Sequence, residues 1–206
     1  MTTMTSKLDL KRQLRPFYSA AKEPVMVDVP ELAFLMIDGH GDPNTATEYS
    51  DAVQALYSVA YAAKFAVKRA SGQDYVVMPL EGQWWVSDMS RFTVADKSAW
   101  DWTMLIAQPD EVTLQIVEEA KERTARKNPS DALQRLGLER FAEGPAAQVM
   151  NFGPYASEGP TIQKLHEFIA EHGQVRAGKH HEIYLSDPRR TAPEKMKTIL
   201  RQPIAA

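Results

Sequence analysis

The sequence predicts an α+β fold in which a unit of strand, turn, helix and strand occurs twice. Short β-favouring runs, ended by clusters of Gly, Pro, Asp or Asn, alternate with stretches in which apolar residues recur every three or four positions. The turn in LMIDGHGDP is echoed in VMNFGPY, and VMPLEG is echoed in EIYLSDP. Because neither unit could bury its apolar faces alone, we expect both to share one antiparallel-rich sheet about a pseudo-twofold axis.

The first half is expected to contain three strand regions and one long helix. Val53, Leu56 and Ala60 recur at helical spacing and indicate a helix that packs on a core. Pro30 divides the first strand region, which forms either two strands or one bent strand. Residues 81–85 are expected to continue the second strand into a turn. The expected elements are strands at 25–30, 32–37, 75–80 and 100–107 and a helix at 51–68.

The second half of the chain is expected to add four helices and two further strands. Pro109 and Asp110 open a stretch whose solvated side is rich in Glu, Lys and Arg. At the end of the chain, residues 191–194 satisfy the capping-box pattern, which predicts a final helix. The expected elements are helices at 109–126, 130–136, 158–172 and 191–200 and strands at 146–152 and 181–185.

The composition indicates a globular protein. With 206 residues, 44% of them hydrophobic and 25% charged, the chain can bury one ordinary core. We expect an N-terminal extension at 1–24 and a single domain at 25–206, with its first unit at about 25–107 and its second at about 139–206. The net charge of −3 argues against a main role in neutralising nucleic acid. A polar N-terminus and the absence of a long apolar window predict a cytoplasmic protein that does not bind membranes.

Metal ions and nucleotide cofactors are not indicated. The chain has no cysteine, which excludes thiolate zinc sites and thiol nucleophiles. His180 and His181 are adjacent, so their rings diverge in an extended strand, and His166 and His172 lack the spacing of one helix face. The glycine motifs of phosphate and dinucleotide sites are missing. We therefore expect neither a metal nor a cofactor.

Glu182 is the first candidate for chemistry. Strand alternation places Glu182 and Tyr184 on one face and Ile183 on the other. If the Ile183 face packs on helices, the carboxylate points either into solvent, as most strand carboxylates do, or into a concavity. Trp84 and Trp85 are adjacent in an extended segment and point oppositely, so one of them is hard to place in the same core. An aromatic pocket would accommodate it.

The segments VMNFGPY and HHEIYLSDPRRTAPEKMKTILRQPI, with LAFLMIDGHGDPN and YVVMPLEGQWW, resemble the GyrI-like small-molecule-binding domain family from about Val25 onward. The resemblance implies duplicated SH2-like βαββ units with a central cleft for hydrophobic, planar or cationic ligands. Related effector domains belong to multidrug-responsive transcription activators, and some stand-alone members are hydrolases that open cyclopropane-bearing alkylators with water. The activators carry an N-terminal helix-turn-helix module, for which this N-terminal extension is too short, so direct nucleic-acid binding is not expected.

By this resemblance, Glu182 matches the cleft glutamate and Tyr155 the tyrosine of the G-P-Y turn. Glu182 would activate a water, and Tyr155 would donate a hydrogen bond to a substrate carbonyl. The same residues would serve a non-catalytic sensor or sequestering protein in which Glu182 pairs with a ligand cation, so catalysis stays open. An adaptor, the third interpretation, would expose Trp84 and Trp85 to a protein partner. The expected ligand-binding side chains are Trp84, Trp85, Tyr184, Phe152, Met78 and Trp102.

Overall fold

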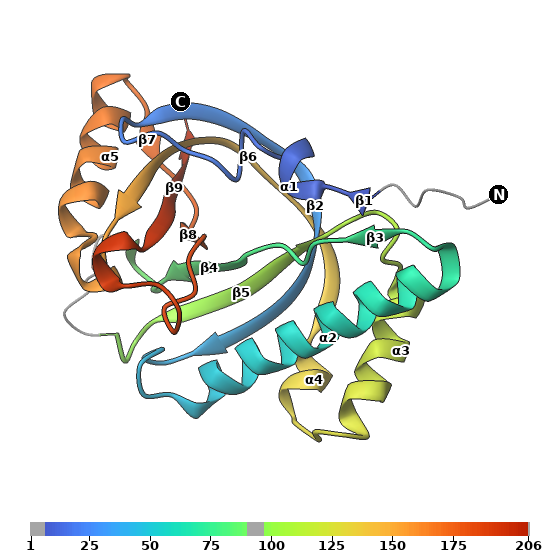
Figure 1. Cartoon of the computed structure of the whole chain (residues 1–206). Coiled ribbons are helices and arrows are strands. Elements are labelled where there is room, and N and C mark those ends of the chain that lie inside the picture. The colour runs from blue at the N-terminus through green and yellow to red at the C-terminus, as the bar shows by residue number, and fades with distance from the viewer. Residues whose placement is uncertain (1–6, 90–96, 206) are drawn as a thin grey trace. The chain divides into compact units, whose positions relative to one another are not determined.

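The computed structural model describes residues 7–89 and 97–205, and this part of the chain combines helices with antiparallel strands, as the sequence predicts (Figure 1). The chain divides into two compact units, and each unit draws on both halves of the sequence. The SH2-like duplication stays a prediction. Unit 1 comprises Met1–Gln13, Leu32–Met78 and Trp85–Phe141, and unit 2 comprises Leu14–Glu31, Pro79–Trp84 and Ala142–Ala206.

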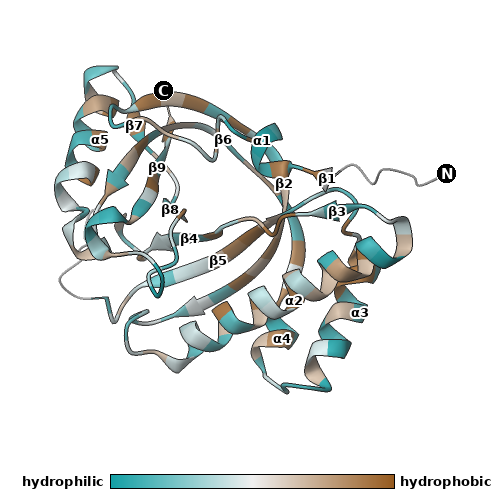
Figure 2. Ribbon diagram, viewed as in Figure 1, coloured by the Kyte–Doolittle hydropathy of each residue, from teal (hydrophilic) through white to brown (hydrophobic). Residues whose placement is uncertain are grey.

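Unit 1 is built on an antiparallel strand pair covered by a long helix. Strand β2 pairs with β5 in the register Ala33↔Gln108 to His40↔Asp101. Helix α2 contacts β5, α3 and α4. Figure 2 shows the apolar character of β5, whose residues from Trp102 onward are buried. The elements are β1 (Lys7–Leu8), α1 (Leu10–Gln13), β2 (Val25–His40, whose residues up to Glu31 belong to unit 2), α2 (Thr47–Ser71), β3 (Asp74–Tyr75), β5 (Asp101–Gln108), α3 (Leu114–Ala125) and α4 (Ala132–Arg135).

Unit 2 is an antiparallel sheet with one helix against it. The strands pair in the order β4, β8, β9 and β6, and the short β7 pairs with the end of β9. Leu165 and Ile169 of α5 pack on Val149 and Leu200 of the sheet. The elements are β4 (Leu80–Trp85, of which Trp85 belongs to unit 1), β6 (Gly137–Phe152, whose residues up to Phe141 belong to unit 1), η2 (Tyr155–Ser157), α5 (Gly159–Glu171), β7 (Val175–Arg176), β8 (His180–Tyr184), η3 (Pro193–Lys195) and β9 (Lys197–Ala205).

The expected final helix at 191–200 is wrong. The capping-box segment forms only the short turn η3, and the chain then continues as strand β9. Residues 198–202 are all buried, and β9 is hydrogen-bonded to β6 along one edge and to β8 along the other. A helix would bury only one stripe of this segment, whereas a central strand buries side chains on both faces. Long-range pairing therefore overrides the local capping signal.

Some strand bounds differ from the expected ones. Residues 81–85, expected to lead into a turn, belong to strand β4, while residues 76–79 lie outside any strand. Strand β6 begins at Gly137 and not at Ala146. Of the two alternatives for the first strand region, the structure has one continuous strand, β2, that runs through Pro30. Of the helices in the part of the chain that the structure describes, none is long and apolar enough to cross a membrane.

Candidate functional site

The carboxylate of Glu182 is bound on both of its oxygens. Nε2 of His180 lies 3.2 Å from Oε1, and the hydroxyl of Tyr184 donates a hydrogen bond of 2.8 Å to Oε2. The three residues alternate along β8 and therefore share one face, which the sequence predicts for Glu182 and Tyr184 but not for His180. The side chain of Glu182 is 13% exposed, and that of His180 is 4% exposed. The carboxylate is thus held in one orientation, on a side chain that is not fully buried.

Strand β4 supplies an indole and a glycine beside this carboxylate. In the antiparallel register, Gly82 pairs with Glu182, and Trp84 pairs with His180. The buried indole of Trp84 donates a hydrogen bond of 3.2 Å to the Tyr184 hydroxyl. A Cβ atom on Gly82 would lie 2.9 Å from Trp84 Nε1 and 3.0 Å from the Tyr184 hydroxyl oxygen. Glycine is therefore required for the indole, the phenol and the carboxylate to line up.

Two accessible rings lie at the second predicted turn. Tyr155 begins η2, directly after Gly153 and Pro154, and its ring meets that of Tyr184 edge to face with centroids 5.4 Å apart. The exposed fraction is 39% for Tyr155 and 46% for Phe152. Glu182, His180, Tyr184 and Trp84 form what we call the Glu182 cluster. Tyr155 contacts this cluster through Tyr184 and also keeps an accessible surface. The ammonium group of Lys22 lies 5.2 Å from the ring centroid of Phe152.

The sheet face of Glu182 is the one that α5 partly covers. Leu200 is the register partner of Glu182 on β9, and cross-strand partners project from the same face. Leu200 packs on Leu165 of α5. The sequence was compatible with helices packed on the Ile183 face. In the structure, that face carries a buried polar network instead.

The other three predicted ligand-binding residues belong to unit 1. Trp102 is fully buried, with its ring so close to Gly39 that a Cβ there would lie 2.1 Å from the indole. Met78 is 2% exposed, and Trp85 is half-buried at the end of β4. Their contact with a ligand stays a prediction. The burial of Trp84, at 3% exposed, does not fit the exposed tryptophan pair that the adaptor interpretation requires.

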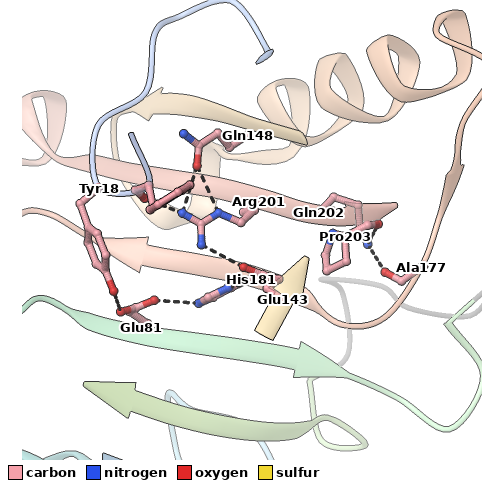
Figure 3. Close-up of polar contacts among 10 residues, drawn as sticks. Tyr18, Glu81, Glu143, Gln148, Ala177, His181, Arg201, Gln202 and Pro203 are labelled. Atoms are coloured by element: carbon pink, nitrogen blue, oxygen red, sulfur yellow. Dashed lines mark hydrogen bonds and ion pairs between the residues drawn. The ribbon is translucent and has the colours of Figure 1, made fainter. Parts of the chain in front are cut away.

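The polar network on the opposite face of these strands was missed by the sequence analysis (Figure 3). Nδ1 of His181 lies 2.8 Å from Glu143 Oε1, and its Nε2 lies 3.1 Å from Glu81 Oε2. Arg201 donates to Glu143 Oε2 at 2.9 Å and to the side-chain amide oxygen of Gln148 at 3.1 Å. The two acidic and two basic side chains are no more than 3% exposed. Such burial is tolerable because each charge has a partner of opposite sign.

The same network binds the segment that precedes β2. The hydroxyl of Tyr18 donates a hydrogen bond of 2.5 Å to Glu81, and the guanidinium of Arg201 donates to the carbonyl of Phe17. Gln148 donates a hydrogen bond of 2.8 Å to the carbonyl of Pro16. The network therefore fastens residues 16–18 to the unit 2 sheet, which is a structural role for most of its members.

In this network, attraction between opposite charges shifts the pKa values of Glu143 and His181 more than burial does. Burial by itself would raise the pKa of Glu143, but the neighbouring His181 and Arg201 charges lower this pKa to about 2. Burial would likewise lower the pKa of His181, but Glu143 and Glu81 raise it to about 9. Burial, followed by the nearby Glu81, raises the pKa of Tyr18 well above its usual value. At neutral pH, His181 is therefore protonated and Glu143 is ionised.

Comparison with known proteins identifies a family that matches most of the chain. The family model described as the GyrI-like small molecule binding domain matches residues 22–205. The crystal structure of an uncharacterized conserved protein from Listeria innocua is 43% identical, covers 97% of this chain and 100% of that chain, and superposes with a TM-score of 0.89. A hydrolase encoded by lin2189 from Listeria innocua is 42% identical with the same coverage and a TM-score of 0.86.

More distant similarity concerns the fold alone. The C-terminal domain of EcmrR is 10% identical, covers 89% of this chain and 97% of that chain, and superposes with a TM-score of 0.55. No curated protein sequence matches the chain significantly.

Proposed function

This chain belongs to the GyrI-like family of small-molecule-binding domains, and we propose that its Glu182 site takes up hydrophobic planar or cationic molecules and hydrolyses cyclopropanoid electrophiles among them. The observation that carries this proposal is the Glu182 carboxylate, which His180 and Tyr184 bind on both oxygens, on a side chain that remains 13% exposed. Two Listeria innocua relatives, 42% and 41% identical to this chain, are described as hydrolases, which supports a catalytic role.

In the proposed reaction, Glu182 accepts a proton from water while the water oxygen bonds to a carbon of the cyclopropane. The strained carbon–carbon bond breaks, and its electron pair moves into the conjugated carbonyl of the substrate. The hydroxyl of Tyr155 donates a hydrogen bond to that carbonyl oxygen as negative charge develops there. Transfer of the proton from Glu182 to the product restores the carboxylate, so the net change is the addition of one water.

The residues around Glu182 keep it oriented for this step. The chain of hydrogen bonds from Trp84 to Tyr184 and on to Glu182 fixes one oxygen, and His180 fixes the other. A preorganised group loses little entropy when it reaches the transition state. The accessible ring of Tyr155 offers a surface on which a planar substrate can stack. Phe152, which is also accessible, is proposed as a further ligand contact, while contact of Trp85, Met78 and Trp102 with a ligand stays a prediction.

The alternative is a non-catalytic sensor or sequestering protein. In that case, Glu182 pairs with a ligand cation, the rings contribute about 0.5 to 2 kcal/mol per cation–π contact, and no bond is broken. This role requires the same open carboxylate and the same rings. For either role, we propose that the protein acts in the cytoplasm and does not bind nucleic acid.

The two roles are distinguished by incubating the full chain with a cyclopropane-bearing alkylator and analysing the mixture by mass spectrometry. Hydrolysis yields a product heavier than the substrate by one water, whereas sequestration returns the compound unchanged. Glu182→Gln should abolish the hydrated product and leave binding of a neutral planar compound largely intact. Glu167→Gln, which alters a carboxylate on the solvent side of α5 that binds Gln163, is the matched control. Hydrated product formed at the wild-type rate by Glu182→Gln would refute the proposed catalytic role.

A further inference from the structure

Unit 1 contains a separate hollow of about 440 Å³, lined by α2 and the end of α3. This volume lies in the range of small-molecule sites. Its walls include Ser58, Phe65 and Arg69 of α2, and Arg123, Lys127 and Asn128 from the end of α3 and the residues after it. The hollow is therefore bordered by cationic and hydrogen-bonding groups together with one aromatic ring.

The three basic side chains of this hollow have no acidic counterpart. No Asp or Glu is among the lining residues. Within residues 7–89 and 97–205, none of Arg69, Arg123 and Lys127 forms an ion pair, whereas their chain neighbours Lys68 and Arg126 pair with Asp74 and Glu122. Like charges gathered around one concavity repel each other and raise its positive potential. An anion in the hollow would relieve that repulsion.

Helix dipoles explain these residues only in part. Basic side chains near a helix C-terminus are stabilised by the dipole, which accounts for Arg69 and Arg123 singly. That effect does not account for an exposed aromatic ring in the lining of the same hollow. The ring of Phe65 is 51% exposed although it lies on a helix that buries seven other apolar residues. Apolar area that faces a charged hollow favours a ligand with both an apolar and an anionic part.

We propose that this hollow binds a small aromatic anion. Its carboxylate, sulfonate or phosphate group would pair with Arg123, Lys127 and Arg69, of which the two arginines can form forked hydrogen bonds. Its ring would pack on Phe65, and Ser58 and Asn128 would supply further hydrogen bonds. A carboxylate such as Glu182 repels anions, so the two sites select ligands of opposite charge. The inference does not depend on what happens at Glu182.

The test uses anilinonaphthalene sulfonate, an aromatic anion whose fluorescence rises in apolar surroundings, and the uncharged N-phenylnaphthylamine as its matched probe. We expect saturable binding of the sulfonate to the full chain, about tenfold tighter than that of the neutral probe. The double variant Arg123→Gln/Lys127→Gln should weaken sulfonate binding about tenfold, and Phe65→Ala should weaken both probes. Arg126→Gln removes a nearby charge that already pairs with Glu122, and should leave both affinities unchanged.

The location of the probe is read from backbone amide NMR shifts. Shifts confined to residues 58–69 and 123–128, and retained in Glu182→Gln, support the inference. Shifts that cluster around Glu182, wild-type affinity in the double variant, or no saturable binding up to about 1 mM would each overturn it. Thermal melts of all variants show that a loss of affinity does not reflect unfolding.

Discussion

His181 and Glu182 follow one another on β8 but project from opposite faces of the unit 2 sheet and bind different partners. His181 lies 2.8 Å from Glu143 inside the buried network, while Glu182 is bound by His180 and Tyr184 on the face that reaches solvent. Because consecutive residues share a peptide bond, the charges that hold His181 also fix the backbone from which Glu182 projects. The buried network therefore supports the candidate site without contacting a ligand.

Removal of the His180 ring should impair turnover rather than ligand binding. His180→Ala frees Oε1 of Glu182, so we expect kcat to fall about tenfold with little change in KM. His180→Gln keeps a hydrogen-bond donor and should recover part of the loss. His172→Ala, which removes an exposed histidine at the end of α5, is the control. The role assigned to His180 fails if the alanine variant keeps the wild-type kcat, or if both variants lose activity only in proportion to a lowered melting temperature.

Gly82→Ala should destabilise unit 2 and disturb the Glu182 cluster. The new Cβ would lie 2.9 Å from Trp84 Nε1, so the indole must move and its hydrogen bond to Tyr184 is lost. We expect the free energy of unfolding to fall by about 1–3 kcal/mol, with a change in tryptophan fluorescence. Gly159→Ala is the matched control, because a Cβ at Gly159 meets nothing within 4 Å. Equal stability of the two variants would contradict this account.

Stability should depend on pH through His181. Its pKa is raised from 6.5 to about 9 in the folded chain, so the stabilisation is complete below pH 6.5 and is lost as the pH rises through about 9. The contribution of Glu143 to stability depends on pH in the opposite direction. Its pKa is lowered from 4.5 to about 2, so its stabilisation is complete above pH 4.5 and is lost as the pH falls through that range. Urea unfolding at a series of pH values measures both slopes.

The alkaline slope should disappear in a His181→Gln variant, since glutamine does not titrate. His172→Gln, an exposed substitution, should retain the slope. An unchanged alkaline slope in His181→Gln would assign the effect to another group.

Arg201→Met should be among the most destabilising single substitutions. It leaves Glu143 buried with one partner fewer and frees the carbonyl of Phe17, so we expect a loss of about 3–5 kcal/mol in the free energy of unfolding. Arg189→Met also removes a guanidinium that pairs with a carboxylate, but that side chain is 86% exposed, and the expected loss is within about 1 kcal/mol. The free energies of unfolding of the two variants are compared by denaturation in guanidinium chloride. A similar midpoint for both would mean that the network contributes little.

The candidate site could be anticipated where local pattern was sufficient. Alternation along 181–185 placed Glu182 and Tyr184 on one face, and the structure confirms this by a direct hydrogen bond between them. The turn before Tyr155 was recognisable from Gly153 and Pro154. Such features depend only on neighbours in the chain, because strand period and turn chemistry are local properties.

The buried network could not be anticipated in the same way. Glu81, Glu143, His181 and Arg201 come from four strands that are distant in sequence, and Arg201 follows a segment whose capping pattern predicts a helix. One signal for the network was available in the sequence. His181 shares a strand face with Ile183, a face that alternation predicts to be apolar. Charge partners of this kind are chosen by strand register, which no local pattern specifies.

The amino-acid sequence alone therefore determined the α+β class, most of the helices and strands, and the face of β8 that carries Glu182. Only the tertiary structure decided that β9 is a central strand, that a charged network lies behind the site, and that α5 covers the face of Glu182. The physical reason is that local periodicity sets which side chains share a face. Burial and pairing between distant segments set what that face meets.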